Sequence, residues 1–91
     1  MPQPDIDPNL TTMAVKIYSP SDTFFDGKAK VVSASNDTGP FDVLPQHHSF
    51  ITLLSAGKVG VVTLDESKQE FDIDGGLMRV RDNTVTIFIG F

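Results

Sequence analysis

The two histidines of the chain, His47 and His48, are the side chains best suited to acid–base catalysis or metal binding. They are adjacent in the sequence, and in an extended segment adjacent side chains point to opposite faces. We therefore expect that they do not share one metal ion, and a packing or contact role is favoured for one of them. The carboxylates of Asp72 and Asp74 alternate with apolar residues, which is typical of a solvated strand face rather than of a catalytic pair in a deep cleft.

Motifs for nucleophilic catalysis or nucleotide binding are missing from the sequence. There is no G-x-S-x-G, no G-x-x-x-x-G-K-[ST] and no G-x-G-x-x-G. Gly75-Gly76 could approach a phosphate, but a tight turn is the favoured interpretation. Serine, histidine and aspartate occur in most small proteins, so their presence does not indicate a catalytic triad. The residues alone therefore indicate no catalytic residue, no metal site and no cofactor, and they favour a domain that binds a partner.

Length and charge exclude further classes of function. With 91 residues the chain is the size of one domain, and its 12 acidic and 7 basic residues give a net charge of -5. Nucleic acids and anionic membranes are bound mainly by lysine and arginine, so neither is expected as a direct partner. The absence of cysteine excludes a disulfide framework and a thiolate zinc site, and it is compatible with a reducing compartment.

Alternating hydrophobicity predicts short β-strands along the whole chain. Met13, Val15 and Ile17, for example, alternate with Ala14, Lys16 and Tyr18, which is the period of a half-buried strand. Turn-forming residues such as Asp26-Gly27 and Asp82-Asn83 separate the segments. The expected strands are residues 13–19, 23–25, 29–35, 41–44, 50–54, 59–64, 69–74, 77–81 and 84–89. The sequence thus predicts an all-β fold, an antiparallel flattened β-sandwich or barrel of about nine to ten short strands.

The first twelve residues differ from the rest of the chain. Three prolines with acids and amides predict a flexible tail over residues 1–12, followed by one domain over residues 13–91. The tail has neither the basic nor the apolar region of a secretory signal. Apolar runs such as residues 50–54 are far shorter than the roughly 20 residues of a membrane-spanning helix. We therefore expect neither a signal nor a membrane span.

A series of short motifs resembles the N-terminal β-sandwich domain of the epsilon subunit of rotary F-type ATP synthases, which is called delta in mitochondria. The most specific motif is Gly39-Pro40-Phe41-Asp42-Val43-Leu44-Pro45-Gln46-His47, which is similar to the family's G-x-[LFM]-x-[IV]-[LY]-P-x-H. Weaker matches precede and follow it in the family's order: Val15 to Pro20, Phe25-x-Gly27, Leu53 or Leu54 before Gly57, Gly75-Gly76-x-x-x-Val80 and Asn83-x-Val85-Thr86-Ile87. The resemblance covers residues 15–89.

The sequence also departs from the family pattern. His48-Ser49 stands where a small residue and proline usually follow the histidine, and Pro40 stands where an acidic residue is common. Asp74 precedes the two glycines where many members have serine. Most bacterial members continue into a C-terminal helical hairpin, whereas this sequence ends at Phe91, so we expect the hairpin to be absent.

The resemblance implies a non-catalytic subunit of the central stalk, which links gamma to the ring of c subunits and couples ion-driven rotation to ATP synthesis. Such a subunit touches the membrane only through the complex, and in a bacterium it lies at the cytoplasmic face of the cell membrane. Residues that match the gamma-facing side are Ser19, His47 and Thr52. Residues that match the loop reaching the c ring are Ser35, Asn36, Asp37, Thr38, Gly39 and Pro40.

Strand periodicity adds an expectation for Thr52. It alternates with Ile51 and Leu53, so it should lie on the opposite face from those two, where exposure explains a polar residue. The alternative function is a stand-alone β-sandwich adaptor or ligand-binding module that shares only the architecture. Gene neighbours or binding to gamma would discriminate between the two.

Overall fold

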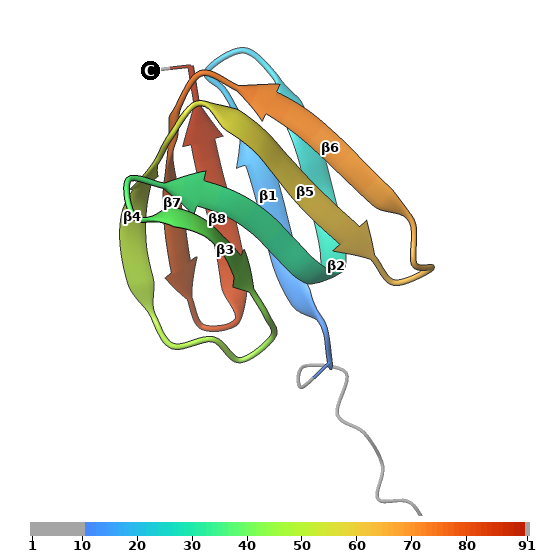
Figure 1. Cartoon of the computed structure of the whole chain (residues 1–91). Coiled ribbons are helices and arrows are strands. Elements are labelled where there is room, and N and C mark those ends of the chain that lie inside the picture. The colour runs from blue at the N-terminus through green and yellow to red at the C-terminus, as the bar shows by residue number, and fades with distance from the viewer. Residues whose placement is uncertain (1–10, 91) are drawn as a thin grey trace, which may run out of the picture.

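The computed structural model describes residues 11–90, and the regular elements in that range are eight β-strands (Figure 1). They are β1 (Met13–Tyr18), β2 (Thr23–Asn36), β3 (Gly39–Val43), β4 (Phe50–Leu54), β5 (Gly57–Thr63), β6 (Lys68–Ile73), β7 (Gly76–Arg81) and β8 (Thr84–Ile89). The described part contains no helix long and apolar enough to cross a membrane. Of the expected tail, only Thr11 and Thr12 lie within the described residues.

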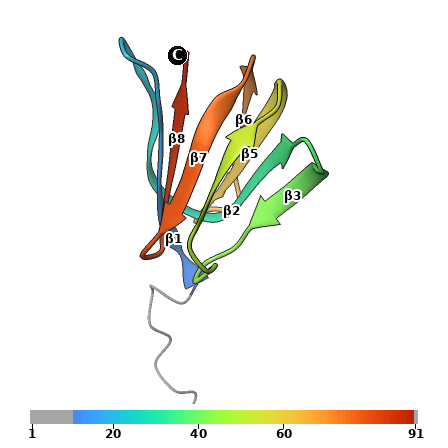
Figure 2. The same ribbon diagram turned by 90° about the vertical axis from the view of Figure 1, so that its left-hand side faces the viewer.

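The strands form two layers that share β2. Their hydrogen-bonded order is β4-β7-β8-β1-β2-β5-β6, with β3 added to β2. The beginning of β2, residues 23–29, pairs with β1, whereas its later part pairs with β5 and, over residues 32–36, with β3. The first layer therefore consists of β4, β7, β8, β1 and the start of β2, and the second of β3, the rest of β2, β5 and β6. Figure 2 shows β7 and β8 facing β3 and β5 across the interior.

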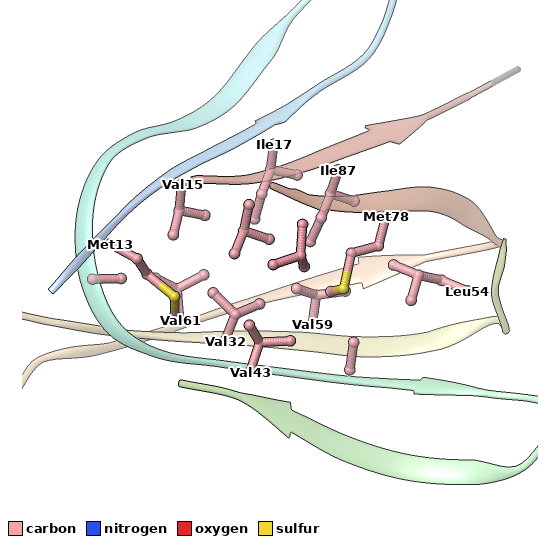
Figure 3. Close-up of a cluster of buried hydrophobic side chains, with 14 of the residues drawn as sticks. Met13, Val15, Ile17, Val32, Val43, Leu54, Val59, Val61, Met78 and Ile87 are labelled. Carbon is pink, nitrogen blue, oxygen red and sulfur yellow. The ribbon is translucent and has the colours of Figure 1, made fainter. Parts of the chain in front are cut away.

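A continuous hydrophobic core fills the space between the layers (Figure 3). It is made of aliphatic side chains from every strand, and none of the described polar or charged residues is buried. The buried residues are Met13, Val15, Ile17, Ala29, Val32, Ala34, Val43, Leu54, Val59, Val61, Ile73, Met78, Val80, Val85 and Ile87. A core of this kind resists deformation because close-packed interiors transmit strain rather than yielding to it.

Several elements confirm the expectations from periodicity. Met13, Val15 and Ile17 of β1 are buried while Lys16 between them is exposed. β7 and β8 are joined by the two-residue turn Asp82-Asn83, whose φ angles of 52° and 59° suit the right-handed twist of a hairpin. The all-β sandwich expected from the sequence is confirmed.

The expected number of strands was too high, because residues 23–25 and 29–35 belong to one strand. Asp26 and Gly27, interpreted as a turn, pair with Lys16 and Val15 of β1 in the ladder. The long strand bends from one layer to the other instead, and its pairing with β5 shifts between Ala29 and Val31. A bulge lets a strand turn a corner without leaving the sheet.

The sheet is also not wholly antiparallel. β1 and β8 pair in parallel, with Val15 opposite Val85 and Ile17 opposite Ile87. This contact joins the first and last strands of the described chain, and local periodicity contains no information about it. The parallel pair places both strands at the centre of the first layer, where their buried residues form the middle of the core.

Candidate partner-binding surfaces

Ser19, expected on the gamma side, closes the turn that follows β1. Its backbone N–H donates to the carbonyl of Asp22 at 2.8 Å, and its Oγ accepts from the Asp22 N–H at 3.2 Å. The side chain is half-buried. The hydroxyl thus stabilises the β1–β2 connection, and its exposed side lies at the end of the first layer.

His47 lies in the β3–β4 connection, at the opposite end of the sandwich from the β1–β2 connection (Figure 1). Its ring stacks on His48 with centroids 4.4 Å apart, and it packs at a tilt against Phe50 at 4.9 Å. The expectation that the two histidines point apart was wrong, because this connection is not a strand and Gln46 turns it with a φ of 65°. Within residues 11–90, no group of three or more possible metal ligands gathers.

Thr52 lies on the opposite face of β4 from Ile51 and Leu53, as expected. The exposed face of β4 is, however, the one that carries Ile51 and Leu53. Ile51 and Leu53 are 65% and 67% exposed, whereas Thr52 is half-buried and lies opposite Met78 in the ladder. Its Oγ1 accepts a hydrogen bond from Nδ2 of Asn36 at 3.2 Å. The expectation of an exposed Thr52 was therefore wrong, because apolar residues occupy both faces of this strand and the threonine hydroxyl finds a partner inside.

The turn expected to face the c ring joins β2 to β3. Asn36 organises it, since its Oδ1 accepts from the N–H of Thr38 at 3.0 Å and from the Thr38 hydroxyl at 2.6 Å. The carbonyl of Ser35 accepts from the N–H of Ser55 at 2.9 Å, which ties the turn to the β4–β5 connection. The exposed residues at its tip are Asp37, Thr38 and Pro40, while Ser35, Asn36 and Gly39 are half-buried.

These contacts show which of the expected site residues come together. Asn36 of the c-ring set is hydrogen-bonded to Thr52 of the gamma set, so the two expected surfaces meet at this point. No hydrogen bond or ring contact among the described residues joins Ser19, His47 and Thr52 to one another. They are distributed along the sandwich rather than gathered in one patch.

The sequence analysis missed an apolar row on the outer face of the first layer, in which Leu53 and Leu77 are exposed and Tyr18 and Phe88 are half-buried. Strand register aligns Leu53 of β4 with Leu77 of β7, then Phe88 of β8, then Tyr18 of β1. The two aromatic rings meet edge-to-face at 5.1 Å. The only local signal was that Phe50–Leu54 is apolar at every position but one, which indicates a strand with two apolar faces. We call these four residues the outer apolar row.

The shifted titrating groups lie away from this row, on the β5–β6 hairpin. A hydrogen bond from Thr63 and others from Ser67 lower the pKa of Asp65, because they stabilise its charged form. The hydrogen bond and charge of Asp72 raise the pKa of Lys58. Both groups are exposed, and they stabilise the turn and ladder of the second layer rather than indicating a catalytic pair.

Comparison with known proteins matches this fold to one family. The family model described as ATP synthase, Delta/Epsilon chain, beta-sandwich domain matches residues 12–90. The ATP synthase epsilon chain of Xanthomonas oryzae pv. oryzae is 34% identical over 80 residues, and that of Xanthomonas campestris pv. campestris is 32% identical. In each case the match covers 88% of this chain and 57% of the relative, so the chain spans little more than half the length of these relatives.

Solved structures show the same architecture at lower identity. A chain in the cryo-EM structure of the Euglena gracilis mitochondrial ATP synthase, OSCP/F1/c-ring, aligns with a TM-score of 0.81 at 18% identity, over 87% of this chain and 51% of that chain. A chain in the central stalk/c-ring structure of the Tetrahymena thermophila mitochondrial ATP synthase aligns with a TM-score of 0.72 at 20% identity. This alignment covers 87% of the present chain and 63% of the Tetrahymena chain. The family model matches residues 12–90, and a curated relative is 34% identical to the chain. The chain therefore belongs to the ATP synthase delta/epsilon chain family and corresponds to the β-sandwich domain of that family.

Proposed function

We propose that the chain is a non-catalytic subunit of the central stalk of a rotary ATP synthase, where it links the γ subunit to the c ring and couples ion-driven rotation to ATP synthesis. The observation that carries the proposal is the match of the family's β-sandwich domain over residues 12–90. Relatives named ATP synthase epsilon chain and a fold shared with chains of ATP synthase structures support it.

The mechanical properties of the fold suit this role. A stalk component transmits torque, so it must hold two partners at a fixed distance without bending. The buried aliphatic core and the ladder that runs through all eight described strands give such stiffness. The function therefore depends on two outer surfaces attached to one rigid body, and not on a reactive side chain.

The contact surfaces are proposed from the positions expected for the family. Ser19, His47 and Thr52 are assigned to γ, and the β2–β3 turn from Ser35 to Pro40 is assigned to the c ring. Support comes from the exposure of the turn's tip and from the hydrogen bonds of Asn36, which hold its shape. Small polar residues at an exposed tip suit contact with the polar loops of a neighbouring subunit.

The location of the chain in the cell follows from its assembly into the ATP synthase complex. As part of the complex the chain is attached peripherally to the membrane that carries the c ring, and in a bacterium this is the cytoplasmic face of the cell membrane. Its net charge of -5 opposes direct binding to anionic lipid, so membrane contact is indirect. No cofactor is assigned.

Site-directed cross-linking in the assembled complex tests the two surfaces. The chain contains no cysteine, so each single-cysteine variant carries one thiol. We expect Thr38→Cys, at the tip of the β2–β3 turn, to cross-link to subunit c, and Ser19→Cys to cross-link to γ. Mass spectrometry of the cross-linked products identifies the partner.

Glu70→Cys is the matched control, because Glu70 is exposed on β6 in the second layer, outside both proposed surfaces. It should give neither product. Cross-linking of Thr38→Cys to subunit c at no more than the level of Glu70→Cys would contradict the proposed c-ring contact.

A further inference from the structure

Aspartate directly precedes glycine at two places in the chain, Asp26-Gly27 and Asp74-Gly75. This dipeptide rearranges without an enzyme where the backbone is free to move, because glycine has no side chain that keeps its nitrogen away from the aspartate carboxyl group. The two pairs have the same chemistry but different surroundings in the fold. The structure therefore predicts different reactivity for them.

The Asp26-Gly27 pair is held in a strand. Asp26 of β2 lies opposite Lys16 of β1, and Gly27 lies opposite Val15. In an antiparallel strand ψ is about +135°, which turns the nitrogen of the following residue away from the side-chain carboxyl group. This part of the β1–β2 ladder must open before the two groups can meet. The fold thus protects the first pair.

The Asp74-Gly75 pair lies between strands, in the connection from β6 to β7 (Figure 1). The chain bends at Asp74, whose side chain is exposed, and neither residue takes part in a ladder. Among residues 11–90, no hydrogen bond outside the ladders involves Asp74 or Gly75. A Cβ at Gly75 would meet nothing closer than the carbonyl oxygen of Leu54 at 3.5 Å, so there is room for movement. The second pair can therefore react without any unpairing.

Other aspartate carboxyl groups of the second layer are held in place. That of Asp42 accepts a hydrogen bond from the Ser33 hydroxyl at 2.7 Å, and that of Asp72 accepts one from the Lys58 ammonium at 3.1 Å. The carboxyl group of Asp74 has no such partner within the described part of the chain. It is free to rotate toward the backbone nitrogen that follows it.

We propose that Asp74-Gly75 is a site of spontaneous isomerisation. The backbone nitrogen of Gly75 attacks Cγ of the protonated Asp74 carboxyl group and forms a C–N bond. The hydroxyl group leaves as water together with the amide proton, and the product is a five-membered succinimide. Water then adds to one of the two ring carbonyl carbons and breaks the C–N bond there, which gives either aspartate or isoaspartate. Nothing is oxidised or reduced, and water is the only co-reactant.

Isoaspartate at this position should loosen the joint between the two layers. β6 belongs to the second layer and β7 to the first, and only Asp74 and Gly75 connect them. The isoaspartyl linkage adds one methylene group to the main chain of this short connection. Both ends are fixed, because Ile73 is buried and Gly76 is so close to Phe88 that a Cβ would lie 2.9 Å from its carbonyl oxygen. The added atom therefore strains the ends of the two strands.

Peptide mapping of the whole folded chain measures both sites at once. Trypsin cuts after lysine and arginine, so Asp26 lies in the peptide 17–28 and Asp74 in the peptide 69–79. The chain is incubated at neutral pH in water enriched in heavy oxygen, because each hydrolysis of a succinimide places one such atom in the product. Electron-transfer fragmentation locates the label and distinguishes isoaspartate from aspartate. Label should accumulate at Asp74 at least about tenfold faster than at Asp26.

The same chain in urea is the matched control, because the ladder that protects Asp26 is then absent. The two sites should be labelled there at rates within about threefold of each other. Asp74→Ser, which introduces the residue that many family members have before the two glycines, should abolish labelling at this position and leave that of Asp26 unchanged. Labelling of Asp26 in the folded chain as fast as that of Asp74 would overturn the proposal.

Thermal unfolding of aged samples tests the effect on the joint. A second transition should appear below the melting temperature of the fresh chain, with an amplitude that follows the fraction of isoaspartate at position 74. It should be absent from Asp74→Ser aged for the same time. If isoaspartate accumulates and the melting temperature is unchanged, the connection absorbs the extra methylene group and the loosening is refuted. The proposed function stands in either case, because neither measurement involves γ or the c ring.

Discussion

Ile87→Ala should reduce the free energy of unfolding by about 2–5 kcal/mol. Ile87 is fully buried on β8, between Met78 of β7 and Ile17 of β1 in the ladder. Its truncation removes apolar contacts on both sides and leaves a cavity that two β-ladders prevent from closing. Urea denaturation followed by far-UV circular dichroism measures the change.

Ile51→Ala is the matched control, because it removes the same atoms from a residue that is 65% exposed. It should change the free energy of unfolding by no more than about 0.5 kcal/mol. A loss for Ile87→Ala no larger than that for Ile51→Ala would show that the centre of the first layer is not the packed core described above.

Gly76→Ala should destabilise the fold by about 1–3 kcal/mol. Gly76 is buried at the start of β7, and a Cβ there would lie 2.9 Å from the carbonyl oxygen of Phe88 and 3.0 Å from Cγ2 of Ile89. The first of these is backbone of the paired strand, so relief requires β7 and β8 to separate. The melting temperature by differential scanning calorimetry should fall accordingly.

Gly27→Ala provides the comparison for that prediction. Gly27 also lies in a ladder, but a Cβ there meets nothing closer than the ring of Phe25 at 3.7 Å. The substitution should therefore leave the melting temperature nearly unchanged. Equal effects at Gly76 and Gly27 would contradict the close approach of β8 to β7.

Much of the fold could be predicted from the local alternation of apolar and polar residues and from the turn-forming residues between the strands. In β1 and β8 one apolar face alternates with a polar or aromatic one, so both strands and their buried residues were anticipated. Asp82-Asn83 was identified as a turn because both residue types tolerate positive φ. These features depend on residues that are neighbours in the sequence, and periodicity describes them well.

Other features depended on contacts between distant residues. Asp26-Gly27 has the composition of a turn, but pairing with β1 holds it in a strand. Thr52 was placed on the exposed face because it is the polar residue among apolar ones, yet burial of Phe50 and Leu54 decides the orientation of β4. The alternation of apolar and polar residues within β1 and within β8 does not indicate that these two strands pair with each other.

The candidate surfaces also consist of features that local sequence pattern predicts and features that depend on contacts between distant residues. Ser19, at the end of β1, and the β2–β3 turn lie where the sequence placed them, since both follow from strand ends and turn residues. The outer apolar row could not be found this way, because it joins residues of four strands that lie up to 70 positions apart. Only the strand register brings these residues to one face.

ATP-driven ion pumping by membrane vesicles that carry the rotary complex tests the central claim most directly. Vesicles depleted of this chain and vesicles to which it is restored are compared for ATP hydrolysis and for ion uptake. If the chain links γ to the c ring, depleted vesicles hydrolyse ATP without pumping, and added chain restores the pumping. Equal pumping per ATP hydrolysed with and without the chain would contradict the account.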